Sequence, residues 1–216
     1  MKNRGYFIAF EGGEGSGKST QVDILIGRLS EEGYAVTPTR EPGGTRIGEQ
    51  IRGITHNQEN VDLDAKTEAY LMAASRAQHV EQLIEPALAA GRVVVCDRYV
   101  DSSIAYQGYG RKLGPESIEM LNELATNGAR PDLTILLDVP LDVGMQRRHA
   151  SNKATDRLDL QRRDFYERVR KGYLALAKKN AARYTVLDAT GSVEDVATLI
   201  WDTVRKHLEK HNVKKT

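Results

Sequence analysis

The 216-residue sequence contains a single cysteine, Cys96, so no disulfide can form within the chain, which is compatible with a reducing compartment. It has no run approaching the ~18 consecutive apolar residues of a membrane-spanning helix. Its first residues hold too short an apolar stretch for a signal peptide. The 31 basic residues nearly balance the 30 acidic ones, and a net charge of +1 gives no electrostatic footprint for nucleic acid or an anionic membrane. We therefore expect a cytoplasmic protein that binds neither.

The composition does provide enough apolar material for one core. Hydrophobic residues make up 40% of the chain and charged residues 28%, a balance typical of folded globular proteins. A chain of this length can bury roughly 70% of the surface that it exposes when unfolded. No repeat or linker interrupts the sequence, so we expect residues 1–216 to form a single domain.

Short apolar runs alternate with amphipathic stretches along the chain. The runs are rich in β-branched residues and predict buried strands, and the stretches between them predict helices. The longest helix candidate covers 65–90, with Gly91 as its end and Pro86 expected to kink or fray its last turn. This alternation predicts a parallel sheet covered on both faces, which binds ligands at the carboxyl ends of its strands. The predicted strands are 6–10, 35–39, 93–96, 133–137 and 184–187.

A glycine-rich motif follows the first predicted strand. The segment 12–19, GGEGSGKS, fits G-x-x-x-x-G-K-[ST] and directly precedes a predicted helix. Its glycines let successive backbone N–H groups turn toward one anion, while Lys18 can reach phosphates and Ser19 can ligate Mg²⁺. The motif predicts ATP or GTP binding but does not choose between a kinase, a motor ATPase and a switch GTPase. The predicted nucleotide-binding residues are Gly12, Gly13, Glu14, Gly15, Ser16, Gly17, Lys18, Ser19 and Thr20.

A second polar segment follows the third predicted strand. Asp97, at the end of that strand, is suited to hold Mg²⁺ or its waters, and Asp138 after the fourth strand is its rival. The neighbouring Arg98 can grip a second phosphate bidentately. Ser103 and Gln107 offer the neutral donors and acceptors that read the edge of a base.

These residues carry a resemblance to bacterial thymidylate kinases (dTMP kinases), which are P-loop nucleoside monophosphate kinases. The resemblance implies the three-layer α/β/α fold of P-loop NTPases, with a five-stranded parallel sheet in the order 2-3-1-4-5. It also implies ATP- and Mg²⁺-dependent phosphorylation of dTMP to dTDP, and a homodimer. The matching blocks are FEGGEGSGKST at 10–20, TREPGGT at 39–45, AASR at 73–76, DRYVDSSIAYQG at 97–108 and DRLD at 156–159.

The resemblance also implies an acceptor pocket. Met72 stands where the family commonly stacks an aromatic ring on thymine; its polarizable sulfur can still contact a ring, and a dUMP kinase stays open as an alternative. Gly15 stands where one branch of the family has a catalytic arginine. A residue other than arginine at this position resembles the bacterial branch, which supplies its arginine from a lid instead. The implied contacts are Arg98 and Arg52 for the phosphate, Arg76, Ser103 and Gln107 for the base, Tyr106 and Glu14 for the sugar, and Glu41, Met72 and Ser102 around them.

Basic residues are concentrated near residue 150. Nine basic and four acidic residues lie between 147 and 171, which predicts a mobile lid at about 147–160 whose arginines stabilise charge on a transferring phosphoryl group. We expect Arg157 first and Arg147 second to be catalytic, together with Lys18 and Arg98. About half of the other arginines should pair on a solvated helix, as Arg163 can with Glu167. The alternative from another class is a nucleotide-dependent switch or binding protein that transfers no phosphate.

Overall fold

The computed structural model describes residues 4–151 and 155–215, and within them five parallel strands form one sheet in the order β2-β3-β1-β4-β5. This confirms the parallel sheet predicted from the sequence and the strand order implied by the resemblance. Every bound lies within two residues of its predicted position. The strands are β1 (Tyr6–Gly12), β2 (Val36–Arg40), β3 (Val93–Asp97), β4 (Leu133–Asp138) and β5 (Tyr184–Asp188).

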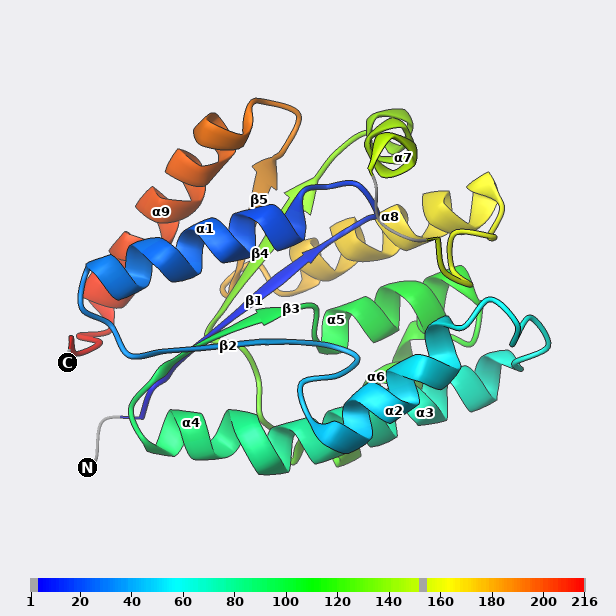
Figure 1. Ribbon diagram of the computed structural model, residues 1–216, viewed down its shortest axis with the longest axis horizontal. Helices are drawn as coiled ribbons and strands as arrows, with labels where there is room; N and C mark the ends of the chain where they lie inside the picture. Colours follow the sequence, from blue (N-terminus) through cyan, green and yellow to red (C-terminus); the bar gives the residue numbers. More distant parts are fainter. Residues whose placement is uncertain (1–3, 152–154, 216) are drawn as a thin grey trace.

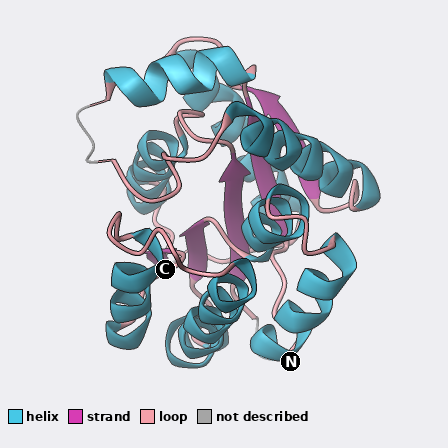
Figure 2. Cartoon of the chain, turned by 90° about the vertical axis from the view of Figure 1, so that its right-hand side faces the viewer, coloured by secondary structure: helices cyan, strands magenta, loops and turns pink. Residues whose placement is uncertain are grey.

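Helices connect the strands and cover both faces of the sheet (Figure 1), which a view turned by 90° also shows (Figure 2). The three-layer α/β/α arrangement is therefore confirmed. The helices are α1 (Lys18–Glu31), α2 (Arg46–His56), α3 (Ala65–His79), the π-helical η1 (Val80–Ile84), α4 (Glu85–Ala89), α5 (Val100–Ser103), the π-helical η2 (Ile104–Gly110), α6 (Pro115–Thr126), α7 (Leu141–Ala150), α8 (Arg163–Lys179) and α9 (Val193–Lys210).

Successive side chains of β1 enter different cores because strand residues point alternately to the two faces of a sheet. Ile8 and Phe10 pack with residues of α1 and α9. Phe7 and Ala9 pack on the other face with residues of η1 and α4. All four side chains are fully buried. A strand buried on both faces reads as a continuous apolar run, which explains why its position could be predicted.

The predicted helix 65–90 is present as a continuous run of α3, η1 and α4, with a π-helical turn inside it. Pro86 lies in the first turn of α4, directly after this turn. Within a continuous helix proline removes one backbone hydrogen bond and its ring crowds the preceding turn, and here it coincides with a local departure from α-helical geometry. The chain leaves the helix through Gly91, whose φ of 76° is the left-handed conformation typical of a helix end.

Helix α1 connects the phosphate loop to the C-terminal part of the chain. It packs against α9, where the Arg28 guanidinium carbon lies 4.6 Å from the centre of the Trp201 ring. Trp201 is buried and is the only tryptophan of the sequence. No helix among the described residues is long and apolar enough to cross a membrane.

Candidate active site

The carboxyl ends of the central strands open onto a cavity of about 600 Å³. Parallel sheets bind ligands at this end of their strands. The cavity is lined by phosphate-loop residues 14–20, by Asp97 and Arg147, and by every residue predicted for the acceptor. Three predicted site residues, all within the described part of the chain, do not line the cavity: Gly12, Gly13 and Arg157. Segments far apart in the sequence therefore meet in one space.

Lys18 closes the phosphate loop on itself. Its ammonium donates hydrogen bonds to the carbonyl oxygens of Gly12 (2.9 Å) and Gly13 (2.8 Å) and to Ser16 Oγ (3.3 Å). Burial, together with the nearby Arg98 guanidinium, lowers the pKa of Lys18 to about 8. The ammonium is thus a poorly solvated cation at the cavity wall, an environment that favours an incoming anion.

Helix α7 rests directly on the phosphate loop through two glycines. Gly15 adopts a φ of 66°, and a Cβ placed there would lie 1.9 Å from the carbonyl oxygen of Gly144 in α7. A Cβ on Gly144 would lie 2.5 Å from the carbonyl oxygen of Glu14. The two backbones are therefore in contact with no space for a side chain, and the loop is tied to the helix that carries Arg147 and Arg148.

The cation-binding chemistry of the site favours Asp97 over its rival. Ser19 Oγ donates to Asp97 Oδ2 at 3.0 Å, and Asp97 Oδ1 is buried without a hydrogen-bond partner among the described residues. Both oxygens of Asp138 instead accept from Arg170 at 2.8 Å. Mg²⁺ prefers oxygen ligands and retains waters and substrate phosphates. A hydroxyl beside an unsatisfied carboxylate oxygen fits such an ion.

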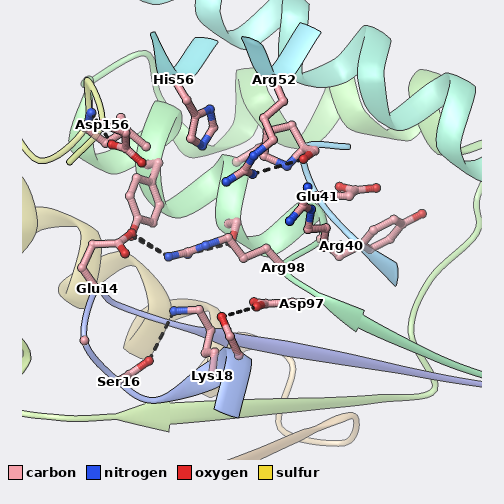
Figure 3. Close-up of a pocket in the computed structure, with 18 of the residues that line it drawn as sticks. Glu14, Ser16, Lys18, Arg40, Glu41, Arg52, His56, Asp97, Arg98 and Asp156 are labelled. Carbon is pink, nitrogen blue, oxygen red and sulfur yellow. Dashed lines mark hydrogen bonds and ion pairs between the residues drawn. The ribbon is translucent and has the colours of Figure 1, made fainter. Parts of the chain in front are cut away.

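Arg98 occupies the middle of the cavity. Its backbone, with a φ of 71° directly after β3, is in the left-handed region that non-glycine residues rarely adopt, and such strain is typical of functional sites. Its guanidinium donates to the carbonyl oxygen of Gly12 (3.1 Å) and to Glu14 Oε1 (2.6 Å). Figure 3 shows Arg52 and His56 extending from α2 toward the same point. The site is therefore strongly cationic at its centre.

Glu14 is the carboxylate that this cationic centre holds ionised. Burial by itself raises the pKa of Glu14, but Arg98, Lys18 and the Tyr106 hydroxyl outweigh it and lower the pKa to about 2. The Tyr106 hydroxyl donates to Glu14 Oε1 at 2.7 Å, and the Arg98 guanidinium carbon lies 5.0 Å from the centre of the Tyr106 ring. Glu14 is thus a pure hydrogen-bond acceptor at neutral pH.

Arg76 also lines the cavity and is held on several sides. The side chain is 3% exposed and donates from Nε to Glu41 (2.7 Å), from Nη1 to Ser103 (3.0 Å) and from Nη2 to the Tyr99 carbonyl (3.1 Å). Nη1 also donates to Asn122, a partner that no motif predicted. The other Glu41 oxygen lies 2.8 Å from His79 Nδ1. Arg76 is therefore fixed in direction before any ligand enters.

The two arginines expected from a lid lie differently. Arg147 lines the cavity and donates to the carbonyl oxygens of Ala189 (2.7 Å) and Thr190 (2.9 Å). Arg157 is buried and forms an ion pair with Glu68 of α3. Part of the expected lid, residues 152–154, lies outside the described residues. On α8, the predicted pair of Arg163 with Glu167 is confirmed, at 3.0 Å.

Several lining residues were not predicted from the sequence. His56 has no motif around it; burial, with Arg52 and Arg98 nearby, lowers the pKa of this imidazole to about 4. Arg148 lines the cavity too, and its guanidinium binds both oxygens of Asp159 (2.9 and 2.5 Å). The matching sequence blocks could have revealed five others, which are Arg40, Pro42, Tyr99, Asp156 and Leu158.

Comparisons with known proteins agree with this geometry. The thymidylate kinase family model matches residues 10–200. A thymidylate kinase of Geobacillus thermodenitrificans is 47% identical over 206 residues, covering 95% of this chain and 92% of the relative, and one of a Synechococcus species is 48% identical over 202 residues, covering 94% and 95%. The crystal structure of thymidylate kinase from Ehrlichia chaffeensis superposes with a TM-score of 0.75 at 34% identity, covering 94% of this chain and 99% of that one. The chain belongs to the thymidylate kinase family.

Proposed function

We propose that this protein is a kinase that transfers the γ-phosphoryl group of ATP to dTMP, giving dTDP and ADP, with Mg²⁺ as cofactor. Membership of the thymidylate kinase family supports this reaction. The observation that carries it is one continuous cavity, in which the phosphate loop faces a pocket with fixed groups for a phosphate, a sugar and a base. Phosphoryl transfer requires little beyond such positioning and charge neutralisation.

The acceptor phosphate binds at the cationic centre. Arg98 offers a planar guanidinium suited to two phosphate oxygens, and Arg52 reaches the same region while donating to the Pro42 carbonyl at 3.2 Å. Arg40 also lines the cavity. A phosphate dianion bound here would accept hydrogen bonds from these arginines in place of protein oxygens, and their positive charges would neutralise it.

The base is recognised by Arg76. Four of its five N–H donors are held by Glu41, Ser103, Asn122 and the Tyr99 carbonyl, and the fifth, on Nη2, has no partner among the described residues. A free donor in a buried pocket selects a carbonyl such as O4 of thymine or uracil and disfavours the amino group of cytosine. Met72 lines the same cavity and is mostly buried, so that its thioether is placed to contact the base.

The sugar lies between these two ends. Glu14, an ionised acceptor, can receive a hydrogen bond from the 3′-hydroxyl. Tyr106 lines the cavity beside Glu14, and its ring disfavours a 2′-hydroxyl. Ser102 and Ser103 complete this wall of the pocket.

The donor side consists of the phosphate loop, Lys18 and a cation held by Ser19 and Asp97. When bound, Mg²⁺ neutralises phosphate charge and orients the phosphates. We propose that 147–160 is a mobile lid of a single domain and that it supplies the arginine for the transferred group. Arg147, which already lines the cavity, is favoured over Arg157, which would have to leave its ion pair with Glu68.

The test is ADP release from Mg·ATP in a coupled assay, with dTMP, dUMP, dCMP, AMP and GMP offered separately. ADP formed with dTMP and matched by dTDP supports the proposal, whereas faster turnover with dUMP favours the uridylate alternative. ADP formation that needs no acceptor would favour a switch protein. Lys18→Ala and Arg98→Ala are each expected to abolish turnover with the fold intact, and near-wild-type kcat/KM in either would refute its role.

A homodimer is proposed from exposed apolar side chains on two helices that pack against each other, α3 and α6, whose outer surface we call the α3/α6 face. Its residues are Tyr70 on α3 and Met120 and Leu124 on α6, exposed to 65%, 72% and 86%. Large apolar side chains clustered at the surface are typical of an interface, and the dimer implied by the resemblance would cover them. Light scattering should give the mass of a dimer for the wild type and of a monomer for Leu124→Glu. Because the substrates are intracellular nucleotides, we propose the cytoplasm as its location.

A further inference from the structure

A buried carboxylate lies behind the base end of the pocket and belongs to none of the predicted sites. Glu68, in α3, is fully buried. Its Oε1 accepts from Gln107 Nε2 at 2.7 Å and its Oε2 accepts from Arg111 Nη2 at 3.0 Å and from Arg157 Nη2. Burial by itself raises the pKa of Glu68, but the hydrogen bonds from Arg111 and Arg157 outweigh it and hold the pKa below its usual value. Glu68 is therefore ionised at neutral pH.

The orientation of the Gln107 amide follows from this partner. An ionised carboxylate only accepts hydrogen bonds, so the Gln107 side chain must turn its NH₂ group toward Glu68. Gln107 lines the cavity and is itself buried. Glu68 thereby holds the NH₂ group through one of its two N–H donors, and the carbonyl oxygen on the other side of the amide is left as an acceptor for a ligand. A glutamine without such a neighbour could present either the oxygen or the nitrogen.

The second Glu68 oxygen connects Arg157, a residue of the expected lid, to helix α3 on the acceptor side of the cavity. The buried Arg157 donates from Nε to the Thr55 carbonyl at 2.9 Å, and its backbone N–H donates to the His56 carbonyl at 3.1 Å. Residues around 157 are thereby joined to the end of α2 that carries His56. A single carboxylate connects this anchor and the Gln107 amide.

We propose that Glu68 is the positioning residue that sets base specificity, by fixing the Gln107 amide so that its oxygen faces the base. This proposal rests on the function proposed above. A pyrimidine with an N3–H donor, as in dTMP or dUMP, would satisfy that oxygen. Cytosine has a lone pair at N3 and would leave two acceptors facing each other in a buried site, which is strongly unfavourable.

The experiment compares kcat/KM for dTMP and dCMP in the wild type and in Glu68→Gln. The variant amide can donate as well as accept, so the Gln107 side chain can rotate. The ratio of kcat/KM for dTMP to that for dCMP is expected to fall about tenfold or more, mainly through KM for dTMP. The matched control is Glu32→Gln, which removes an exposed carboxylate 2.8 Å from Lys215 and should leave the ratio unchanged.

A double-mutant cycle separates positioning from a general loss of stability. If Glu68 acts through Gln107, adding Glu68→Gln to Gln107→Ala should change the ratio by less than about twofold. The inference would be overturned if the wild type phosphorylates dTMP but Glu68→Gln leaves the ratio unchanged. It would also be overturned if Glu68→Gln lowers the ratio equally in the wild type and in Gln107→Ala. A wild type without dTMP-dependent activity would instead refute the proposed function.

A measurement on the wild type covers the case in which Glu68→Gln does not fold. The side-chain NH₂ signals of Gln107 are identified by ¹⁵N NMR from their absence in Gln107→Ala. With dTMP bound, these protons should show nuclear Overhauser contacts to the Glu68 side chain. Absence of those contacts would mean that the nitrogen is turned away from Glu68, and the inference would be wrong.

Discussion

The contact between Gly144 and the phosphate loop allows a prediction whose size follows from one interatomic distance. In Gly144→Ala the new Cβ would lie 2.5 Å from the Glu14 carbonyl oxygen, whereas ordinary contact begins at 3.4 Å. Helix α7 and the loop must therefore separate by about 1 Å, because both partners are constrained in a packed interior and no side-chain rotation relieves the contact. We expect a loss of about 1–3 kcal/mol in the free energy of unfolding.

The catalytic consequence should be larger than the loss of stability. A displacement of about 1 Å in the groups that position a reaction can lower its rate about 10²-fold. Helix α7 carries Arg147 and Arg148 at the cavity wall, so kcat should fall about 10- to 100-fold. KM for dTMP should rise as well, because the displaced backbone belongs to Glu14, whose carboxylate pairs with Arg98 and is proposed to receive the hydrogen bond of the sugar 3′-hydroxyl.

The assay is the coupled measurement of ADP release at saturating ATP, with thermal unfolding measured in parallel. The matched control is Gly27→Ala in α1, where a Cβ would meet nothing within 4 Å. This exposed helical position should gain about 0.5–1 kcal/mol of stability with unchanged kcat. A folded Gly144→Ala variant with wild-type kcat would refute the view that the loop and α7 must stay in contact.

Further predictions concern titration and cation binding. A bound anion should raise the lowered pKa of Lys18, so ATP binding should take up protons near pH 8 and should weaken as the pH rises above 8. Calorimetry in two buffers of different ionisation enthalpy measures this proton uptake, and the Lys18→Arg variant should not show it. Asp97→Asn should raise the Mg²⁺ concentration for half-maximal activity about tenfold or more, and an unchanged midpoint in a Mg²⁺ titration would contradict its role. The pKa of His56 lies below that of an unfolded chain, so the stability it contributes above pH 6.5 should be lost as the pH falls toward 4. Measured by urea unfolding over this pH range, the free energy of unfolding of His56→Gln should fall by about 1–3 kcal/mol less than that of the wild type.

The sequence was sufficient for the sheet because burial on both faces leaves a local signal. The runs around Phe7 and Val94 are apolar throughout, and their ends could be placed within two residues. The π-helical turn before Pro86 was not predicted, although the proline was expected to disturb the helix. The exact form of a disturbance depends on how the neighbouring helix turns pack, which spacing along the chain does not contain.

Site residues could be predicted where a short motif determines the local arrangement of its own side chains. The loop around Lys18 and the strand end at Asp97 and Arg98 are local arrangements, and the structure brings them together. Arg157 shows the limit: its sequence block suggested a phosphate contact, whereas its partner Glu68 lies 89 residues away in the chain. His56 likewise enters the cavity only because α2 packs beside it. Such partners are set by tertiary packing.

The packing of Trp201 against Arg28 gives the molecule an intrinsic optical reporter. This lone indole contacts the last turns of α1, the same helix whose first residue is Lys18. A shift of α1 on nucleotide binding would change the distance between the guanidinium and the ring, and with it the indole emission. Tryptophan fluorescence can therefore follow movement at the phosphate loop without any label, from a position outside the cavity lining.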